Sequence, residues 1–183
     1  MKILAVSGSP RRDSHNTHLL RAAIEAAPEG VEVELWHGLG DLPLYDQDLD
    51  TTEPVESVRR LREAWGTADA ILFSTPEYNG SVPGGLKNAI DWASRPVRES
   101  ALTNQTVSVI GSSTGQFGAM WAQQDLRRIL GAAGARVVGD ELPVSRVHEK
   151  LDHQGRLLDA ELYERLRLVL ETLASEAVPG SAG

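Results

Sequence analysis

Short apolar runs alternate with amphipathic stretches along most of this chain, and the alternation predicts strands and helices in turn. Ile3 to Val6 and Ala70 to Phe73 are apolar runs bounded by polar residues, as expected of strands buried on both faces of a parallel sheet. Val31 to Trp36 alternates apolar and charged residues, which predicts a strand near a sheet edge with one wetter face. Further strands are expected over Thr106 to Ile110 and from Arg136 to Gly139.

Apolar residues recur at helical spacing in most of the gaps between the expected strands and again near the C-terminal end. The positions that mark these helices are Leu19, Leu20, Ala23 and Ile24; Val55, Val58, Leu61 and Trp65; Leu86, Ala89, Ile90 and Ala93; Leu126, Ile129 and Leu130; and Leu162, Leu166, Val169, Leu170 and Leu173. Strands that alternate with helices predict an α/β fold with a parallel sheet, right-handed crossovers and helices on both faces. We expect one domain over residues 1–176 and a frayed tail over residues 177–183.

The loop after the first strand distinguishes between the two common windings of such a sheet. A dinucleotide-binding unit needs G-x-G-x-x-G there, whereas this loop reads Gly8-Ser9-Pro10-Arg11-Arg12-Asp13. The Walker pattern of nucleotide-binding loops, G-x-x-x-x-G-K-[ST], is also absent. This leaves a doubly wound, five-stranded sheet in the flavodoxin-like order 2-1-3-4-5, which binds its ligand at the carboxyl ends of strands one and three. In that order the loops after strands one, three and four meet at one end of the sheet.

Composition limits the chemistry that this fold can perform. Eighteen basic against twenty-six acidic residues give a net charge of -8, which opposes binding to nucleic acid or to an anionic membrane. The chain has no cysteine, so disulfides, thiolate metal sites and dithiol redox chemistry are excluded, and no metal site is expected. The apolar run Ile3 to Val6 is too short for a signal peptide or a membrane span, so we expect a cytoplasmic protein.

The loop after the first strand carries hydroxyls, an amide and a guanidinium at the point where a helix begins. Its candidate ligand-binding residues are Ser9, Arg11, Ser14, Asn16 and Thr17. Several donors beside the positive end of a helix dipole are what a terminal phosphate requires. An alternative is that Ser14 or Asn16 simply caps the helix and that Arg11 is solvated.

The stretch from Ser74 to Arg95 joins the third strand to the next helix through a loop dense in turn formers. Pro76, Gly80, Pro83, Gly84 and Gly85 leave several backbone amides outside any ladder and free to bind a ligand. An ordinary strand-to-helix turn would explain the same residues, so this pattern alone leaves both readings open.

Two motifs resemble those of a known family, the NADPH-dependent FMN reductases, which are flavodoxin-like and include quinone, azo-dye and chromate reductases. Gly8-Ser9-x-Arg11-x-x-Ser14-x-Asn16 resembles the family's phosphate motif. Pro76-Glu77-Tyr78-Asn79-Gly80-Ser81-x-Pro83-Gly84-x-Leu86-Lys87-Asn88-Ala89-Ile90-Asp91-Trp92 resembles its flavin motif. With the strand spacing, the resemblance covers nearly the whole chain down to Ala174.

The resemblance implies bound FMN, with the backbone of Pro76 to Gly80 along the isoalloxazine edge and Ser113 to Gly115 on the other side. The cofactor-binding residues that follow are Ser9, Arg11, Ser14, Asn16, Thr17, Pro76, Glu77, Tyr78, Asn79, Gly80, Ser113 and Gly115. Glycines at 80, 115 and 118 suit places where a flat ring approaches a backbone that has no Cβ in the way. The resemblance also shows a departure, because many family members carry Arg where this chain has Trp121.

Three further expectations concern side chains of the second motif. Tyr78 is expected beside the flavin ring. The backbone of Glu77 is expected to matter more than its charge, because a reduced, anionic flavin would repel the carboxylate. Asp91 and Trp92 are expected to serve a helical hydrogen bond and core packing.

The function implied by the resemblance is an FMN-dependent NAD(P)H oxidoreductase. A hydride passes from NADPH or NADH to flavin N5, and two electrons then pass to a quinone or another small-molecule acceptor by a ping-pong route. No catalytic side chain is expected, because the cofactor carries the chemistry. The resemblance also suggests a homodimer or homotetramer with the helix from Asn88 to Arg95 at an interface.

Three alternatives stay open at this point. A flavin reductase would release reduced FMN to a monooxygenase, and a flavodoxin-like electron carrier would lack nicotinamide chemistry. A flavin-free interaction module of the same fold would remain colourless when FMN is added.

Overall fold

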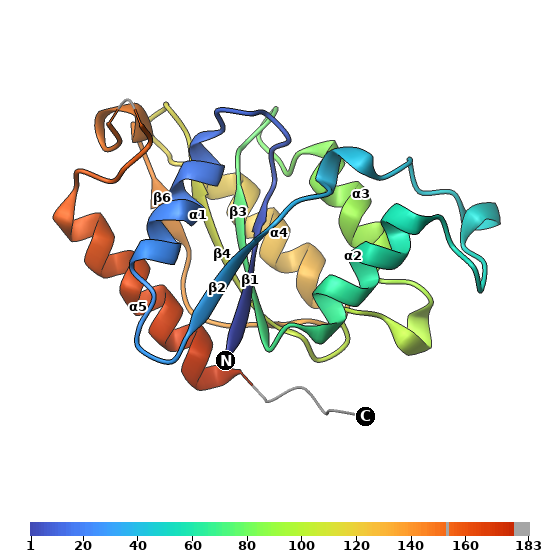
Figure 1. The fold of residues 1–183 in the computed structure, drawn as a ribbon. Helices are drawn as coiled ribbons and strands as arrows, with labels where there is room; N and C mark the ends of the chain where they lie inside the picture. Colours follow the sequence, from blue (N-terminus) through green and yellow to red (C-terminus); the bar gives the residue numbers. More distant parts are fainter. Residues whose placement is uncertain (153, 178–183) are drawn as a thin grey trace.

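A computed structural model, which describes residues 1–152 and 154–177, shows strands and helices alternating along the chain (Figure 1). The strands are β1 (Lys2–Ser7), β2 (Glu32–Trp36), β3 (Ala70–Thr75), β4 (Thr106–Ser112), β5 (Arg136–Val137) and β6 (Leu142–Val144). The helices are α1 (His15–Glu25), α2 (Glu56–Thr67), α3 (Gly84–Ala93), α4 (Met120–Ala132) and α5 (Ala160–Glu176). The tail expected over residues 177–183 lies, from residue 178 onward, outside the described residues.

The sheet has the order β2-β1-β3-β4-β5, and every pairing in it is parallel, so the predicted winding is confirmed. Ser7 at the end of β1 lies opposite Ser74 of β3, and Thr75 lies opposite Gly111 of β4. Because these strands end level with one another, the loops that follow β1, β3 and β4 leave the sheet at the same edge, at the top of Figure 1.

The fifth position of the sheet is filled by two short strands. β5 pairs with the beginning of β4, where Thr106 faces Arg136, and β6 pairs with its end, where Ser112 faces Val144. The strand expected over Arg136 to Gly139 is therefore correct only for its first two residues. Gly139 has a φ of 65°, which turns the chain out of the extended conformation before β6 rejoins the sheet.

β4 is longer than the sequence predicted, because it continues through Gly111 and Ser112, which were expected to begin a loop. A Cβ on Gly111 would lie 2.7 Å from the carbonyl oxygen of Thr75 on the neighbouring strand. A glycine at this position therefore permits close pairing of β4 with β3, which carries Ser112 to the edge of the sheet.

Two hydrophobic cores lie on the two faces of the sheet. The core on one face packs α1 and α5 on β1, β3, β4 and β6. The core on the other face packs α2, α3 and α4 on the same central strands and includes Trp92, which is fully buried as expected. Figure 1 shows this division, with α1 and α5 to the left of the sheet and α2 and α3 to the right. Helices on both faces confirm the predicted layers.

The segment that follows β2 is held against α3 by side chains of the second motif. The Asn88 amide accepts from the N–H of Tyr45 at 2.7 Å and donates to the carbonyl of Pro43 at 2.8 Å. The Trp92 indole N–H donates to the same carbonyl at 2.9 Å. Asn88 and Trp92 therefore fix a loop that carries no regular ladder of its own.

Arg62 of α2 fixes the same segment further along. Its guanidinium donates to Asp50 at 2.7 Å and to the carbonyl of Trp92 at 3.1 Å, and its Cζ lies 5.8 Å from the Trp92 ring centroid. The Arg62 and Asp50 side chains are only 15% and 12% exposed, so water screens this ion pair little.

Replacing Asp50 by alanine is expected to lower the free energy of unfolding by about 2 to 3 kcal/mol, because a largely buried guanidinium then lacks its carboxylate. Urea denaturation of the variant measures this. Glu63→Ala is the matched control, since Glu63 is 65% exposed in its pair with Arg59. It should change stability by less than about 0.5 kcal/mol. Equal losses in the two variants would contradict the account of the Arg62 anchor.

Candidate functional site

The candidate site lies where the loops after β1, β3 and β4 meet at the carboxyl edge of the sheet (Figure 1). The winding places β1 and β3 next to each other, with their crossovers leading to opposite faces. A sheet of this kind binds its ligands at such a point.

The first loop ends at the N-terminus of α1, which lacks the usual means of satisfying its backbone N–H groups. Ser14 occupies the N-cap position with an extended φ/ψ of -71° and 126°, yet no side chain caps the helix and its first turn holds no acidic residue. His18 is the first residue whose N–H bonds within the helix, to the carbonyl of Ser14. The N–H groups of His15, Asn16 and Thr17 are therefore available to an anion.

The predicted phosphate residues of the first loop fall into two groups. Ser9, Ser14, Asn16 and Thr17 are buried, whereas Arg11 is exposed. The Ser9 hydroxyl accepts from the N–H of Arg11 at 3.3 Å, and the Thr17 hydroxyl lies 2.8 Å from that of Ser7. These two hydroxyls already stabilise the loop, although each retains hydrogen-bonding capacity.

Asn16 connects three elements through its side-chain amide. Its Oδ1 accepts from the Ser74 hydroxyl at 2.8 Å and from the N–H of Ser112 at 3.0 Å, and its Nδ2 donates to the Ser112 carbonyl at 3.1 Å. α1 is thereby fastened to the ends of β3 and β4. The alternative reading of Asn16 as a helix cap is wrong, because Asn16 lies inside the helix and makes these contacts instead.

The second loop forms a tight reverse turn. Tyr78 and Ser81 exchange two backbone hydrogen bonds of 3.1 and 3.2 Å, and Asn79 and Gly80 between them have φ values of 53° and 71°. Positive φ at both central residues favours the Asn-Gly pair found here. Within the described part of the chain, the N–H groups of Asn79 and Gly80 have no protein acceptor.

Two features of this turn bear on a flat ligand. The Tyr78 side chain is 52% exposed. A Cβ on Gly80 would meet no atom within 4 Å, so there is open space beside the backbone on that side of the turn. Pro76 and Glu77 connect the turn to the end of β3. The predicted segment Pro76 to Gly80 is therefore well placed for backbone contacts with a ligand.

The second loop is tied to α4 through side chains. The Glu77 carboxylate accepts from the N–H of Ala122 in the first turn of α4 at 3.2 Å, and the Ser81 hydroxyl donates to Asp125 at 2.7 Å. The Glu77 backbone was expected to matter more than its charge, and the structure adds a role for the carboxylate. Its charge faces the positive end of the α4 dipole, where a carboxylate is stabilising.

Replacing Glu77 by alanine removes this cap and is expected to lower the free energy of unfolding by about 1 kcal/mol. Hydrogen exchange of the Ala122 amide should accelerate in the same variant. Glu77→Gln is the control, because its amide oxygen still accepts from Ala122, and it should lose less stability. An Ala122 exchange rate that is the same in all three proteins would refute the capping role.

The third loop is held from behind by the segment around β6. The Ser113 N–H donates to the carbonyl of Val144 at 3.1 Å, and the carbonyls of Ser113 and Gly115 accept from Val147 and Arg146 at 3.1 and 3.0 Å. A Cβ on Gly118 would lie 2.6 Å from the Val144 nitrogen. Close packing against β6 therefore requires a glycine at this position, independently of the expected approach of a ring.

Sequence reasoning missed Ser74 and Ser112, both buried at the ends of their strands. Ser74 bonds to Asn16, whereas the Ser112 hydroxyl is buried without a hydrogen-bond partner in the structure. A buried hydroxyl of this kind favours a missing polar ligand. Serine at the carboxyl ends of two otherwise apolar parallel strands is the signal that could have revealed these residues.

Two histidines of α1 stay uncharged near this loop. Burial lowers the pKa of His15, and the positive charge of Arg11 lowers it further. Burial also lowers the pKa of His18, with Arg21 as the next cause. Both imidazoles are therefore largely neutral at pH 7, which leaves the arginines and the helix dipole as the local sources of positive charge.

A hollow of about 370 Å³ lies beside the first loop, between that loop and the residues that follow β2. Ser9, Arg11 and Thr17 line it together with Arg12 and Arg21. Ser14, Asn16 and the second and third loops do not line this hollow. The twelve predicted residues thus gather at one edge of the sheet but do not all line one cavity.

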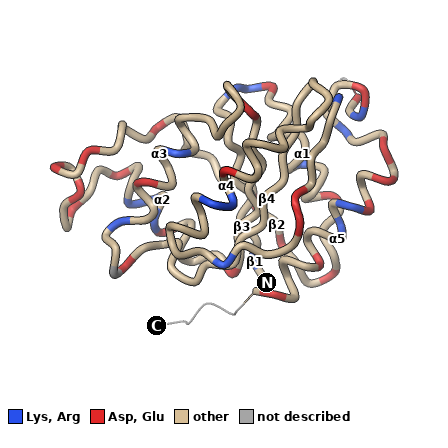
Figure 2. Tube along the Cα trace, turned by 180° about the vertical axis from the view of Figure 1, so that it is seen from behind, with Lys and Arg blue, Asp and Glu red and all other residues tan. Residues whose placement is uncertain are grey.

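Outside the site, three findings concern charge, metal ligands and hydropathy. Acidic and basic segments are interspersed over helices and loops (Figure 2). Among residues 1–152 and 154–177, no cluster of three or more His, Asp or Glu side chains is arranged to hold a metal ion. A membrane-spanning helix is likewise not found in the same residues, since none is both long and apolar enough.

Comparison with known proteins gives consistent results. A family model described as NADPH-dependent FMN reductase matches residues 1–149. An NAD(P)H-dependent FMN reductase of Pseudomonas aeruginosa is 40% identical over 174 residues, which is 94% of this chain and 93% of that protein. A quinone reductase of Escherichia coli is 36% identical over 169 residues, covering 91% of this chain and 89% of the relative.

A solved structure extends the likeness to three dimensions. FerB of Paracoccus denitrificans, described as a flavoenzyme NAD(P)H:(acceptor) oxidoreductase, superposes with a TM-score of 0.83 at 33% identity. The match covers 97% of this chain and 99% of FerB.

Proposed function

The chain belongs to the NADPH-dependent FMN reductase family, and from this premise we propose that it transfers two electrons from NAD(P)H to a quinone through FMN bound at the three loops. When bound, FMN supplies the redox chemistry, because its N5 accepts a hydride from nicotinamide and passes two electrons and a proton on. With one further proton from water, the quinone leaves as a hydroquinone.

The observation that carries this proposal is the uncapped N-terminus of α1 beside the unpartnered hydroxyl of Ser112. Both are donors without an acceptor, and Asn16 holds them close together through its bonds to Ser112. A phosphate brings several acceptor oxygens and negative charge to this place, so the residues present fit the terminal phosphate of FMN. Ser9, Arg11, Ser14 and Thr17 are proposed to complete this phosphate site.

The flavin ring is proposed to lie beside the Asn79-Gly80 turn. The free N–H groups of these residues can donate to the ring edge, and the open side of Gly80 leaves room for a flat group. Pro76, Glu77 and Tyr78 are proposed to border the ring on the same side, and Ser113 and Gly115 on the other. The protein's part is to position the cofactor and exclude water, with no catalytic side chain required.

Arg11→Ala is expected to weaken FMN binding about tenfold to a hundredfold, since one charge-assisted contact to phosphate is worth about 1.5 to 3 kcal/mol. Fluorescence titration of the apoprotein with FMN measures the change. Riboflavin is the control ligand, because it lacks the phosphate, and Arg11→Ala should leave its affinity unchanged. Equal affinities of the unaltered protein for FMN and riboflavin would refute the phosphate site.

Steady-state kinetics test the catalytic proposal. If nicotinamide and quinone approach the same face of the ring in turn, double-reciprocal plots for NADPH and a quinone should be parallel, and NADP⁺ should compete with the quinone. Intersecting lines would show a ternary complex and overturn the shared site. A protein that oxidises no NADPH or NADH, yet holds photoreduced flavin, would be an electron carrier and would overturn the enzyme assignment.

We further propose that residues 1–176 work as a single domain within a homodimer or homotetramer. Support comes from a hollow of about 350 Å³ between α3 and α4 and from Val97, which is 68% exposed at its rim. Apolar surface of this kind suits a subunit contact. Light scattering of the purified protein measures the mass, and a monomer at micromolar concentration would contradict this part of the proposal.

A further inference from the structure

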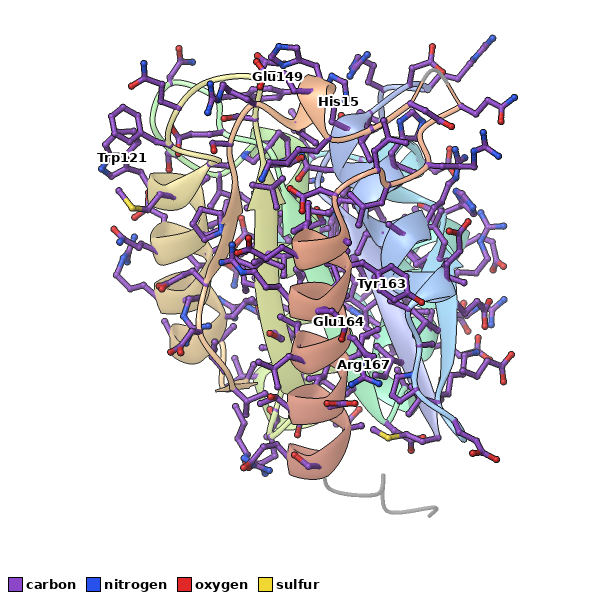
Figure 3. The ribbon with its side chains drawn as sticks, turned by 90° about the vertical axis from the view of Figure 1, so that its left-hand side faces the viewer. His15, Trp121, Glu149, Tyr163, Glu164 and Arg167 are labelled. Carbon is purple, nitrogen blue, oxygen red and sulfur yellow. The ribbon has the colours of Figure 1, made fainter. Side chains whose placement is uncertain are left out.

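Two aromatic side chains are partly exposed to solvent beside the proposed flavin position. Phe117 is 55% exposed and Trp121 is 43% exposed, and their ring centroids are 4.8 Å apart with planes tilted by 57°. Figure 3 shows Trp121 projecting outward at the start of α4, on the far side of the molecule from Tyr163 of α5. Because the two rings touch, they form one continuous apolar surface, which we call the aromatic lip.

The aromatic lip adjoins the second loop through bonds already described. Ala122, next to Trp121 in the chain, donates to Glu77, and Asp125 accepts from Ser81. Both bonds join the Tyr78 turn to the first turns of α4, from which Trp121 projects. The lip therefore lies at the border of the site where the ring edge is proposed to sit.

The backbone beneath the lip is fixed. Gly118 packs against the backbone of Val144 with no room for a Cβ, and Ala119 adopts a left-handed φ of 62°. The Phe117 carbonyl accepts from the N–H of Met120 at 3.1 Å, which closes the turn into α4. A lip on such a rigid turn is preorganised, so binding to it costs little ordering entropy.

The chemistry of the lip suits a neutral, flat, aromatic ligand. The faces of indole and phenyl rings are electron-rich and stack favourably on an electron-poor ring, and larger ring systems bury more area. The carboxylates of Glu77 and Asp125 lie on the same border and disfavour an anionic ligand. A quinone with two fused rings has all of the required properties.

We propose that the aromatic lip stacks on the electron acceptor and makes neutral two-ring quinones better substrates than one-ring quinones. The inference rests on the proposed function, because it places the acceptor beside the same flavin. Phe117 and Trp121 act through binding and take no part in the chemical steps at the flavin.

The kinetic test uses three acceptors on the holoenzyme. Trp121→Ala should raise the KM for menadione, a two-ring quinone, about tenfold at unchanged kcat. For 1,4-benzoquinone the KM should change less than about threefold, and for ferricyanide, which has no ring to stack, it should not change. Phe117→Ala should show the same ranking with smaller effects, and Trp121→Phe should restore the menadione KM.

The control variant is Leu168→Ala. Leu168 lies on α5, is 62% exposed and is remote from the proposed site, so its replacement should leave all three KM values unchanged. Anaerobic reduction of the flavin by NADPH, followed on its own, should have the same rate in Leu168→Ala and in the unaltered protein.

A binding measurement without turnover completes the test. Trp65 and Trp92 are fully buried and Trp36 is half-buried, so Trp121 is the most exposed of the four tryptophans. Menadione should quench the tryptophan fluorescence of the oxidised protein, and the quenching should be lost in Trp121→Phe although that variant keeps its menadione KM. This measurement tests binding to the aromatic lip without any turnover. A failure of NADPH to reduce the flavin would refute the proposed function but would leave this binding test valid.

Three results would overturn the inference. The first is an unchanged menadione KM in both alanine variants. The second is an equal rise in KM for menadione and ferricyanide, which would show general damage to the site. The third is a change of molecular mass in Trp121→Ala by light scattering, which would show that a second copy of the chain covers the lip.

Discussion

Asn16→Ala is expected to lower the free energy of unfolding by about 3 to 5 kcal/mol and to abolish FMN retention during purification. The side chain makes three buried hydrogen bonds, to the Ser74 hydroxyl and to the N–H and carbonyl of Ser112. Alanine leaves all three groups buried without a partner, and each such group costs about 1 to 3 kcal/mol. The loss also releases α1 from the ends of β3 and β4, so the proposed phosphate donors no longer converge.

Urea denaturation and the flavin-to-protein absorbance ratio measure these two effects. Gln124→Ala is the control, because it also deletes an amide but from an exposed position on α4, and it should change stability by less than about 0.5 kcal/mol. An Asn16→Ala protein with unaltered stability would show that Ser74 and Ser112 find other partners. Such a result would show that Asn16 is not needed to hold α1 against the ends of β3 and β4.

Gly118→Ala is the second substitution with a large expected effect, a loss of about 3 to 5 kcal/mol in unfolding free energy. The new Cβ would lie 2.6 Å from the nitrogen of Val144, 2.7 Å from the carbonyl carbon of Pro143 and 2.8 Å from the nitrogen of Ser145. All three are backbone atoms and cannot rotate away. The φ of 58° adds strain, because a side chain rarely adopts this conformation.

Gly131→Ala in α4 is the matched control for the same change of residue. A Cβ at Gly131 would meet nothing within 4 Å, and alanine favours a helix, so this variant should gain about 0.5 to 1 kcal/mol. Thermal unfolding of the two variants should therefore shift in opposite directions. A Gly118→Ala protein as stable as the unaltered chain would show that the third loop can move away from β6.

The layers and the strand order could be predicted from the sequence because they depend on local pattern and on general rules of winding. Apolar runs such as Ala70 to Phe73 and the helical spacing of Leu162, Leu166 and Leu170 are visible along the chain. Because the loop after β1 lacks the dinucleotide-binding motif, the sequence predicted the flavodoxin-like strand order. The structure confirms the order β2-β1-β3-β4-β5.

The details of the site depend on contacts between residues far apart in the chain, which no local pattern encodes. Asn16 bonds to residues 58 and 96 positions away, and Glu77 caps a helix 45 positions away. The sequence proposed both as site residues, but it gave no indication that the Glu77 carboxylate caps α4. The packing of Gly118 on Val144 and the split of the fifth strand were missed for the same reason.

The central claim is that FMN bound at the three loops accepts electrons from NAD(P)H and passes them to a quinone. Anaerobic absorbance titration of the purified protein tests it most directly. Stoichiometric NADPH or NADH should bleach the visible absorbance of the flavin without any other substrate. One equivalent of menadione should then restore the colour. A flavin that stays oxidised with both nicotinamides, or a protein that binds no FMN, would contradict the claim.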